Sequence, residues 1–172
     1  VALKTITIPE QITNIGNSAF RDCTGLTSVT IGNSVTTIGS YAFSGCTMLT
    51  KINWNAKNVS DFISSSDVFY NAGKSGDGID VVFGDNVEAI PAYLFYPYSS
   101  YSPKIISVEF EEGSVCEHFC SMRGSRIKSI TLPDCIKELD EMAFYNCKEL
   151  KSAKLPASLT TIPKSAFELC TS

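Results

Sequence analysis

LTSVTIGNSVTTIGSYAFSGCTM, residues 26–48, decides the fold, because the chain repeats this stretch at a fixed interval. It is 23 residues long, and LKTITIPEQITNIGNSAFRDCTG at 3–25 precedes it with the same pattern. A period of this length is typical of a solenoid, in which each unit is too small to bury its own apolar face and buries it against its neighbours. The sequence therefore predicts a stack of similar coils.

Eight apolar positions recur together in the first two units. In the second unit they are Leu26, Val29, Ile31, Val35, Ile38, Ala42, Phe43 and Cys46. Apolar and polar residues alternate from Ser28 to Ile31, which predicts a short strand with one buried face. Ala42, Phe43 and Cys46 follow with the spacing i, i+1 and i+4, which places them on one face of a single helical turn. Each unit is expected to contain a strand, a bend and a short helical turn.

The period extends over seven units that cover nearly the whole chain. They run over 3–25, 26–48, 49–77, 78–104, 105–126, 127–149 and 150–172. The third unit is enlarged by a polar insertion, the fourth carries PYSSYSP after Tyr96, and the fifth loses the pattern after its strand. We expect one solenoid domain over 1–172. Because solenoids need capping segments and neither end shows one, we also expect the chain to be a piece of a longer array.

The repeat also locates the expected strands and core. One parallel sheet is predicted from strands near Thr5–Ile8, Ser28–Ile31, Lys51–Trp54, Asp80–Phe83, Ser107–Phe110, Ser129–Leu132 and Ser152–Leu155. A single buried row of rings is predicted from Phe20, Phe43, Phe95, Phe144 and Phe167. The two predictions depend on the same alignment of the units, so an error in one would appear in the other.

Charge and hydropathy exclude several classes of protein. Eighteen acidic against fourteen basic residues give a net charge of −4 without a basic cluster, which argues against a nucleic-acid partner. No apolar run approaches the roughly 18–20 residues that a spanning helix needs, so no membrane insertion is expected. The N-terminal residues VALKTITIPE also lack the features of a signal peptide.

The cysteines are best explained as small core residues. Four of the seven, Cys23, Cys46, Cys147 and Cys170, occupy the same position beside the Ala-Phe pair. Buried free cysteine packs as a small hydrophobe. Stacked coils could bring such thiols within disulfide range, but parallel side chains rarely give the required torsion and an odd count leaves one unpaired. We expect seven free thiols.

Cys116, His118 and Cys120 form the only local cluster that resembles metal ligands. Their C-x-H-x-C spacing is not that of a zinc finger, and no second ligand pair follows at a suitable distance. His118 is the only histidine and has no matching nucleophile and acid-base set. We therefore expect no metal, no cofactor and no catalytic residue, and the chain is not expected to be an enzyme.

The repeated pattern L-x-S-[IV]-x-[IL]-[PG]-x-x-[VIL]-x-x-[IL]-[GP]-x-x-A-F-x-x-C resembles the BspA-type, or Treponema pallidum-type, leucine-rich repeat. Units one, two, six and seven fit closely, and unit five fits only over its strand. The better-known leucine-rich repeat has an asparagine about nine residues into the unit. Here that position holds Gln11, Ser34, Lys57, Asn86, Cys135 and Ser158, so no asparagine ladder is expected.

The resemblance implies both a fold and a setting. The fold is an α/β solenoid, a right-handed leucine-rich-repeat superhelix with a parallel β-sheet on one face and short helical turns on the other. Members of this family are displayed on the surface of host-associated bacteria and some protists, where they serve in adhesion to host matrix proteins or other cells. The resemblance supplies no catalytic residues. It implies that this chain acts at the cell surface or is secreted.

Two sets of exposed residues are candidates for contact with a protein or glycan partner. The first lies on the outward face of the predicted strands and includes Lys51, Asn53 and Glu109 among columns of Ser and Thr, which can equally serve to stabilise the sheet. The second is the tyrosine group of the fourth unit, which comprises Tyr93, Tyr96, Tyr98 and Tyr101. Tyrosine is enriched in contact hot spots. The same rings could simply cover the inserted loop.

Two classes of function remain open. The chain is either a non-catalytic surface-displayed adhesion or protein-interaction module, or a structural spacer or targeting array in a larger secreted protein whose activity lies in another domain. A repeat framework by itself does not decide between them, because function depends on what the framework displays.

Overall fold

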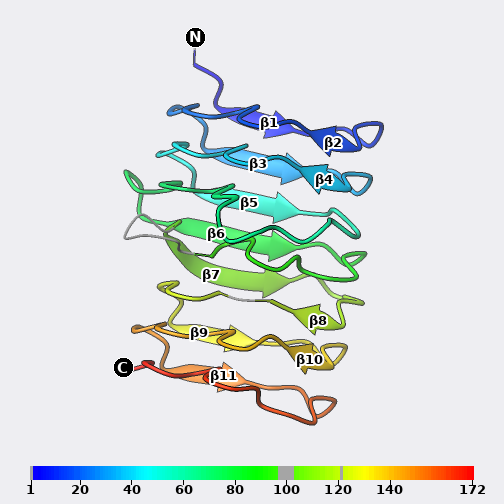
Figure 1. Cartoon of the computed structure of the whole chain (residues 1–172), viewed down its shortest axis with the longest axis vertical. Coiled ribbons are helices and arrows are strands. Elements are labelled where there is room, and N and C mark those ends of the chain that lie inside the picture. Colours follow the sequence, from blue (N-terminus) through cyan, green and yellow to red (C-terminus); the bar gives the residue numbers. More distant parts are fainter. Residues whose placement is uncertain (1, 97–102, 121) are drawn as a thin grey trace.

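The computed structural model describes residues 2–96, 103–120 and 122–172. The chain winds into a β-solenoid whose coils are stacked along the longest axis, with the two termini at opposite ends (Figure 1). The described residues include no helix that is long and apolar enough to cross a membrane.

Parallel strands form one face of the solenoid. Five of them make a continuous sheet in the order β1 (Thr5–Thr7), β3 (Ser28–Ile31), β5 (Lys51–Trp54), β6 (Ile79–Phe83) and β7 (Ile105–Phe110). A separate parallel pair, β9 (Ser129–Thr131) and β11 (Ser152–Lys154), continues the same face (Figure 1). Equivalent positions of successive units pair with one another, as Ser28 does with Lys51 and Lys51 with Asp80. The predicted parallel strands are confirmed, but the sheet is interrupted between β7 and β9.

Four shorter strands, which the sequence did not indicate, follow the sheet strands. β2 (Asn14–Ile15) pairs with β4 (Thr37–Ile38), and β8 (His118–Phe119) pairs with β10 (Glu138–Leu139). Each buries only its second residue. A strand of two residues gives too little alternation to be recognised in a sequence.

The predicted helical turns are wrong, because no helix forms in the described residues. In the first coil, the Ala19, Arg21 and Cys23 amides close tight turns onto the carbonyl three residues earlier. The amides between them donate to the next coil, and the Phe20 N–H reaches the Ala42 carbonyl oxygen at 2.8 Å. Alternate amides thus bond within and between coils, whereas a helix would use every amide internally.

Left-handed backbone conformation recurs at two fixed positions of the unit and explains this alternation. The first position holds Ser18, Tyr41, Asp67, Tyr93, Met142 and Ser165, all with φ between 46° and 60°. The second holds Asp22, Gly45, Asn71, Gly124, Asn146 and Leu169, with φ between 56° and 73°. Only glycine, and to a lesser degree Asn and Asp, adopts this region readily. The second position is therefore occupied mainly by glycine, asparagine and aspartate, which tolerate the left-handed conformation, and Leu169 is the exception.

Replacing Leu169 by asparagine should stabilise the protein. Leu169 has a φ of 62° and is 48% exposed, so its side chain contributes little burial to offset the strained backbone. We expect Leu169→Asn to raise the free energy of unfolding by about 0.5–1 kcal/mol in urea denaturation. Glu168→Asn is the matched control, because its φ is not positive. Equal effects of the two substitutions would contradict the assigned conformation.

Stacked phenylalanine rings fill the core behind the turns. Phe43 lies between Phe20 and Phe69, with ring centroids 5.1 and 5.3 Å away, and Phe69 contacts Phe95 at 5.5 Å. A second stack joins Phe119 to Phe144 at 5.2 Å and Phe144 to Phe167 at 5.1 Å. The described rings thus form two stacks and not the single row that was predicted. The predicted burial is confirmed for Phe43, Phe95 and Phe144. It is wrong for Phe20 and Phe167, which are only half buried because each stacks on one side.

The fifth coil keeps more of the repeat than its sequence indicates. The Met122 N–H donates to the Ala143 carbonyl oxygen, as Phe20 does to Ala42, so Met122 takes the phenylalanine position. Ser125 takes the cysteine position, and its Oγ lies 3.3 Å from the Cys147 Sγ. Both residues are buried. The core therefore continues through the coil, with Phe119 of β8 supplying the ring that Met122 lacks.

Candidate functional site

The outward face of the sheet carries the first set of predicted residues. Lys51 is exposed, and it lies between Ser28 and Asp80 on the neighbouring strands. Asn53 is half buried, and its Nδ2 donates to the Thr30 Oγ1 at 3.1 Å. This bond supports the structural role of the polar columns. Glu109 is exposed two strands further along, on β7, and so lies apart from Lys51 and Asn53.

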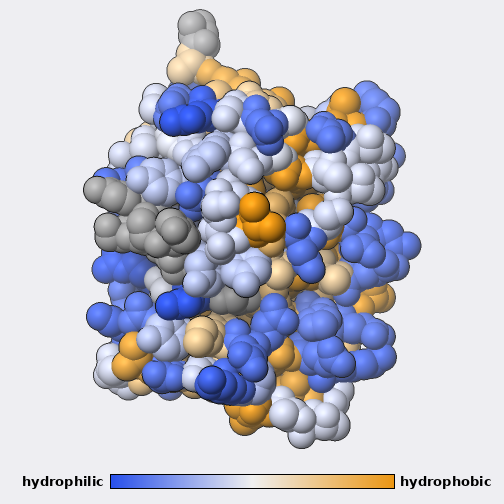
Figure 2. Space-filling view, in the orientation of Figure 1, coloured by the Kyte–Doolittle hydropathy of each residue, from blue (hydrophilic) through white to orange (hydrophobic). Residues whose placement is uncertain are grey.

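Figure 2 shows that the side of the molecule in view is mostly hydrophilic. Hydrophobic residues are visible there mainly in a narrow band that follows the long axis, with a few scattered among the polar ones elsewhere. This side therefore presents no broad apolar patch of the kind that marks a large hydrophobic interface.

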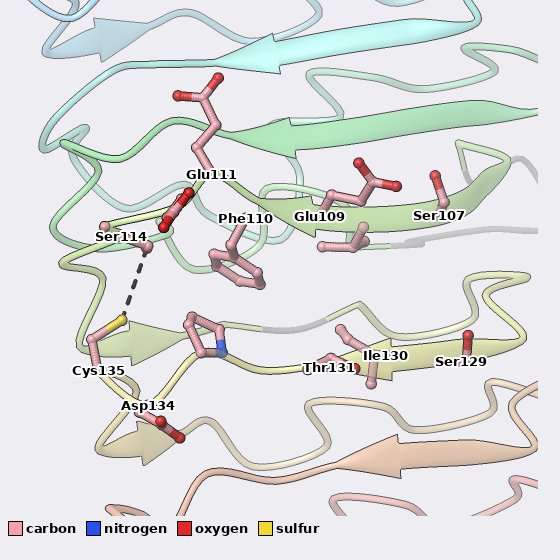
Figure 3. A pocket seen from close by; sticks show the side chains of 14 residues that line it. Ser107, Glu109, Phe110, Glu111, Ser114, Ser129, Ile130, Thr131, Asp134 and Cys135 are labelled. Carbon is pink, nitrogen blue, oxygen red and sulfur yellow. Dashed lines mark hydrogen bonds between the residues drawn. The ribbon is translucent and has the colours of Figure 1, made fainter.

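The interruption between β7 and β9 forms a groove of about 700 Å³. It is lined by residues 107–114 on one side and by Ser129–Thr131 with Pro133–Cys135 on the other. Figure 3 shows the Phe110 ring lying between the two strands. Ligand sites in proteins commonly occupy about 300–1,000 Å³, so the groove has the size of a binding site.

An insertion in the fifth coil accounts for the groove. His118 pairs with Glu138 in the next coil and forms a β-bridge with Ala89 in the preceding coil. Glu138 and Ala89 are each the twelfth residue of their unit, whereas His118 is the fourteenth residue of its unit. The fifth coil therefore has two extra residues between β7 and β8, in the segment EEGSVC. The extra length lets β7 and β9 separate. The coils still join beyond both ends of the groove, where Arg126 N–H donates to the Ile105 oxygen at 2.8 Å and where β8 pairs with β10.

Separation of the strands leaves backbone groups without sheet partners. In the regular coils, the backbone N–H of the sixth residue of a unit donates to the carbonyl oxygen of the fifth residue of the next unit. The Ile8 N–H reaches the Thr30 oxygen in this way at 2.8 Å, and the Leu132 N–H reaches the Lys154 oxygen at 3.0 Å. The equivalent pair is Phe110 and Thr131, and β7 and β9 form no ladder in the described residues. By the alternation of a parallel ladder, the free groups belong to Val108, Phe110, Ser129 and Thr131.

Carboxylates dominate the rim of the groove. Its lining includes four acidic residues, Glu109, Glu111, Glu112 and Asp134, and no lysine, arginine or histidine. All four are exposed, and none has a basic side chain within 4 Å in the part of the chain that the structure describes. The Asp85 backbone N–H donates to Glu111 Oε2 at 3.4 Å, which fixes one carboxylate at the end of the groove. The site therefore combines free strand edges with uncompensated negative charge.

The described tyrosines of the fourth unit form a separate cluster around Arg123. Tyr93 and Tyr96 lie edge to face with centroids 5.0 Å apart. The Arg123 guanidinium lies 5.2 Å from the Tyr96 ring and 4.5 Å from the Tyr145 ring, and its Nη1 donates to the Tyr96 hydroxyl at 3.0 Å. Tyr96 thus has a structural role, while Tyr93 is 44% exposed. Tyr98 and Tyr101 lie outside the described residues, so their predicted contact role stays a prediction.

All seven cysteines are free thiols. The Cys46 Sγ–H donates to the Phe20 carbonyl oxygen at 3.2 Å, and Cys170 makes the same bond to Phe144, so these thiols join neighbouring coils. Burial raises the pKa of Cys46 to about 12 and that of Cys116 to about 11. Both thiols therefore stay protonated and unreactive at neutral pH, because the thiolate is the reactive form.

The C-x-H-x-C cluster does not converge on one point. Cys116 and Cys120 are buried, whereas His118 is exposed and its Nε2 lies 3.4 Å from Glu138 and 3.5 Å from Asp140. Alternation along β8 exposes His118 and buries Phe119, whereas Cys116 and Cys120 lie outside this strand and are buried. Burial raises the pKa of the Asp140 carboxyl, with the His118 side chain acting in the opposite direction. No group of three possible metal ligands occurs among the residues that the structure covers.

Comparison with known families agrees with this repeat geometry. The family model for the BspA type leucine rich repeat region matches six copies, over residues 1–102 and 65–172. The chain belongs to this BspA-type family. The resemblance inferred from the repeated pattern is thereby confirmed.

Several solved structures are similar to most of this chain. A leucine-rich repeat protein of Treponema pallidum is 23% identical, with 96% of this chain and 65% of that chain covered and a TM-score of 0.51. The pneumococcal vaccine antigen PcpA is 19% identical, with 94% and 42% covered and a TM-score of 0.55. A leucine-rich cell surface protein of Faecalibacterium prausnitzii is 22% identical, with 98% and 58% covered and a TM-score of 0.45. A search of curated proteins finds no match.

This chain spans between about two fifths and two thirds of the length of these solved structures. At such identities the likeness supports the fold alone. Sequence reasoning identified Glu109 but missed Glu111, Glu112 and Asp134 beside it. The available signal was the acidic segment EFEEG at the point where the repeat weakens.

Proposed function

We propose that this BspA-type chain is a non-catalytic protein-interaction module, displayed at the cell surface or secreted, that binds a protein or glycan on host or neighbouring cells. The observation that carries the proposal is the groove between β7 and β9. The strands on both sides of it are paired in parallel, with one register shift between Ile79 and Asp80 of β6, so the interruption is a local elaboration of a repeat framework. Insertions into repeat proteins are commonly where binding surfaces arise.

A binding experiment tests this function. The purified chain should bind in a saturable manner to at least one member of a panel of immobilised host matrix proteins or to intact host cells, as measured by biolayer interferometry and flow cytometry. Excess unlabelled chain should compete for the same sites. Absence of saturable binding to every member of the panel would contradict the proposal.

A spacer or targeting array in a larger secreted protein is the second candidate function. It is favoured by the polar columns, since Asn53 bonds to Thr30 across the sheet and the Asn14 Nδ2 donates to the Thr37 Oγ1 at 2.7 Å. Side chains that bond to one another in this way stabilise the stack without a ligand. A spacer should show no saturable binding in the experiment above, so one measurement separates the two functions.

A further inference from the structure

The groove between β7 and β9 has properties that the rest of the sheet lacks. Inside the stack, all other strand edges of the sheet are paired with a neighbouring coil, so a partner can contact only side chains there; the outer edges of β1 and β11, at the two ends of the stack, are the exceptions. In the groove, backbone N–H and C=O groups of two strands have no ladder partner in the described residues, and the Phe110 ring lies between the strands (Figure 3). Unpaired strand edges are templates for the addition of another extended segment.

The rim of the groove specifies the charge of such a segment. Glu109 lies on β7, Glu111 and Glu112 follow it, and Asp134 lies beyond β9, so carboxylates stand at the rim on both sides of the groove. In Figure 3 the Glu109 and Glu111 side chains are directed away from β9 and that of Asp134 away from β7, so the charges flank the groove and do not fill it. Since no basic residue lines the groove, an empty site leaves these charges in mutual repulsion. A cationic segment would neutralise them with charge-assisted hydrogen bonds.

The floor of the groove adds an apolar surface. Phe110 is half buried, whereas the equivalent rings Trp54 and Phe83 on the preceding strands are fully buried. Ile130 and Pro133 lie on the opposite side of the groove. A segment in which basic and apolar residues alternate would place its charges on the rim and its apolar side chains on this floor, because alternate side chains of a strand face opposite sides.

We propose that the groove between β7 and β9 binds an extended, lysine- or arginine-containing segment of a protein partner, with backbone hydrogen bonds to the free strand edges and ion pairs to the acidic rim. This proposal rests on the interaction function proposed above and names the chemistry of the partner. The groove is held open by the joined coils at both ends, so little ordering is required on binding.

A second explanation of the carboxylates predicts the opposite behaviour. Charged residues beside an open edge prevent it from pairing with other copies of the same chain. If this is their only role, neutralising them should cause self-association and should not affect the binding of a peptide.

A designed peptide tests the proposal. The probe is acetyl-Lys-Val-Lys-Val-Lys-Val-amide with a fluorescent label, titrated with the chain in fluorescence anisotropy, and the matched probe replaces every lysine by glutamate. We expect saturable binding of the lysine peptide only. The double variant Glu109→Gln with Asp134→Asn should bind about tenfold more weakly, since each exposed ion pair contributes up to about 1 kcal/mol. The control variant, Asp77→Asn with Glu168→Gln, removes the same charge elsewhere on the surface and should bind normally.

Two further measurements examine the backbone contacts and the alternative ligands. N-methylation of the three valines, or in a second peptide of the three lysines, preserves charge but blocks alternate N–H groups, and at least one of these peptides should bind several-fold more weakly. If both methylated peptides bound as tightly as the unmethylated peptide, the proposal would be overturned. Displacement of the peptide by CaCl2 but not by NaCl at matched ionic strength would overturn it as well. Sedimentation velocity that shows the double variant self-associating, with peptide binding unchanged, would favour protection of the edge instead.

The two proposals can fail separately. If the lysine peptide does not bind while the chain still binds matrix proteins or cells, the groove is not the contact site and the interaction function stands. If neither experiment shows binding, both proposals fail and the spacer function is favoured.

Discussion

Replacing Phe43 by alanine is expected to lower the free energy of unfolding by about 3–5 kcal/mol, as for other fully buried aromatic side chains. Phe43 is fully buried and its ring is stacked on both sides, 5.1 Å from Phe20 and 5.3 Å from Phe69. Truncation would leave a cavity that three adjacent coils enclose. The measurement is equilibrium unfolding in urea, with the slope against denaturant compared between variants.

Phe20→Ala is the control for this substitution. Phe20 is half buried and stacks only on Phe43, so we expect its loss to be clearly smaller than that of Phe43. A loss below about 1 kcal/mol for Phe43→Ala would mean that the ring is not enclosed by its neighbours, and the alignment of the coils would be wrong.

Replacing Gly73 by alanine is expected to cost about 2–4 kcal/mol, because two separate penalties add. Gly73 has a φ of 69°, which strains any residue with a Cβ atom. An added Cβ would also lie 2.5 Å from the Ile79 Cγ1 and 2.9 Å from the Leu49 carbonyl oxygen. The Leu49 oxygen belongs to the backbone that leads into β5, so it cannot move without disturbing that strand.

Two other glycines separate the contributions to the Gly73 effect. Gly113 has a φ of 83° but no atom within 4 Å of its added Cβ, so Gly113→Ala should cost only the conformational term of about 1 kcal/mol. Gly16 has neither the positive φ nor a close neighbour, so Gly16→Ala should be neutral or slightly stabilising. If urea denaturation gave equal costs at all three positions, the close approach at Gly73 would be refuted.

The sequence was sufficient to predict the parallel strands because the repeat constrains them many times over. An alignment error of one residue would move every apolar side chain of a strand to the outer face. The predicted strand Lys51–Trp54 and its alignment with Ser28–Ile31 therefore match the structure. The helical turns were wrong for a related reason. Spacing identifies which residues share a face, but it does not reveal whether an amide bonds within its coil or to the next one.

The groove could not be predicted because it depends on a difference in length within one coil. The segment EEGSVC carries two extra residues, but the coil returns to the repeat by Met122 and Ser125, which replace the usual Phe and Cys. Without the structure, these replacements look like a loss of the pattern. The acidic residues at 109, 111, 112 and 134 become neighbours only when β7 and β9 lie side by side, which a single sequence does not show.

Amide hydrogen exchange tests the central claim most directly, namely that an otherwise paired parallel sheet is open between β7 and β9. The structure predicts rapid exchange for the Phe110 and Thr131 amides, which lack a ladder partner. It predicts slow exchange for the equivalent Leu132 amide, which donates to the Lys154 oxygen at 3.0 Å, and for Gly84, which donates to the Trp54 oxygen at 2.9 Å. Protection of Phe110 and Thr131 as strong as that of Leu132 and Gly84 would contradict the open groove and the binding site built on it.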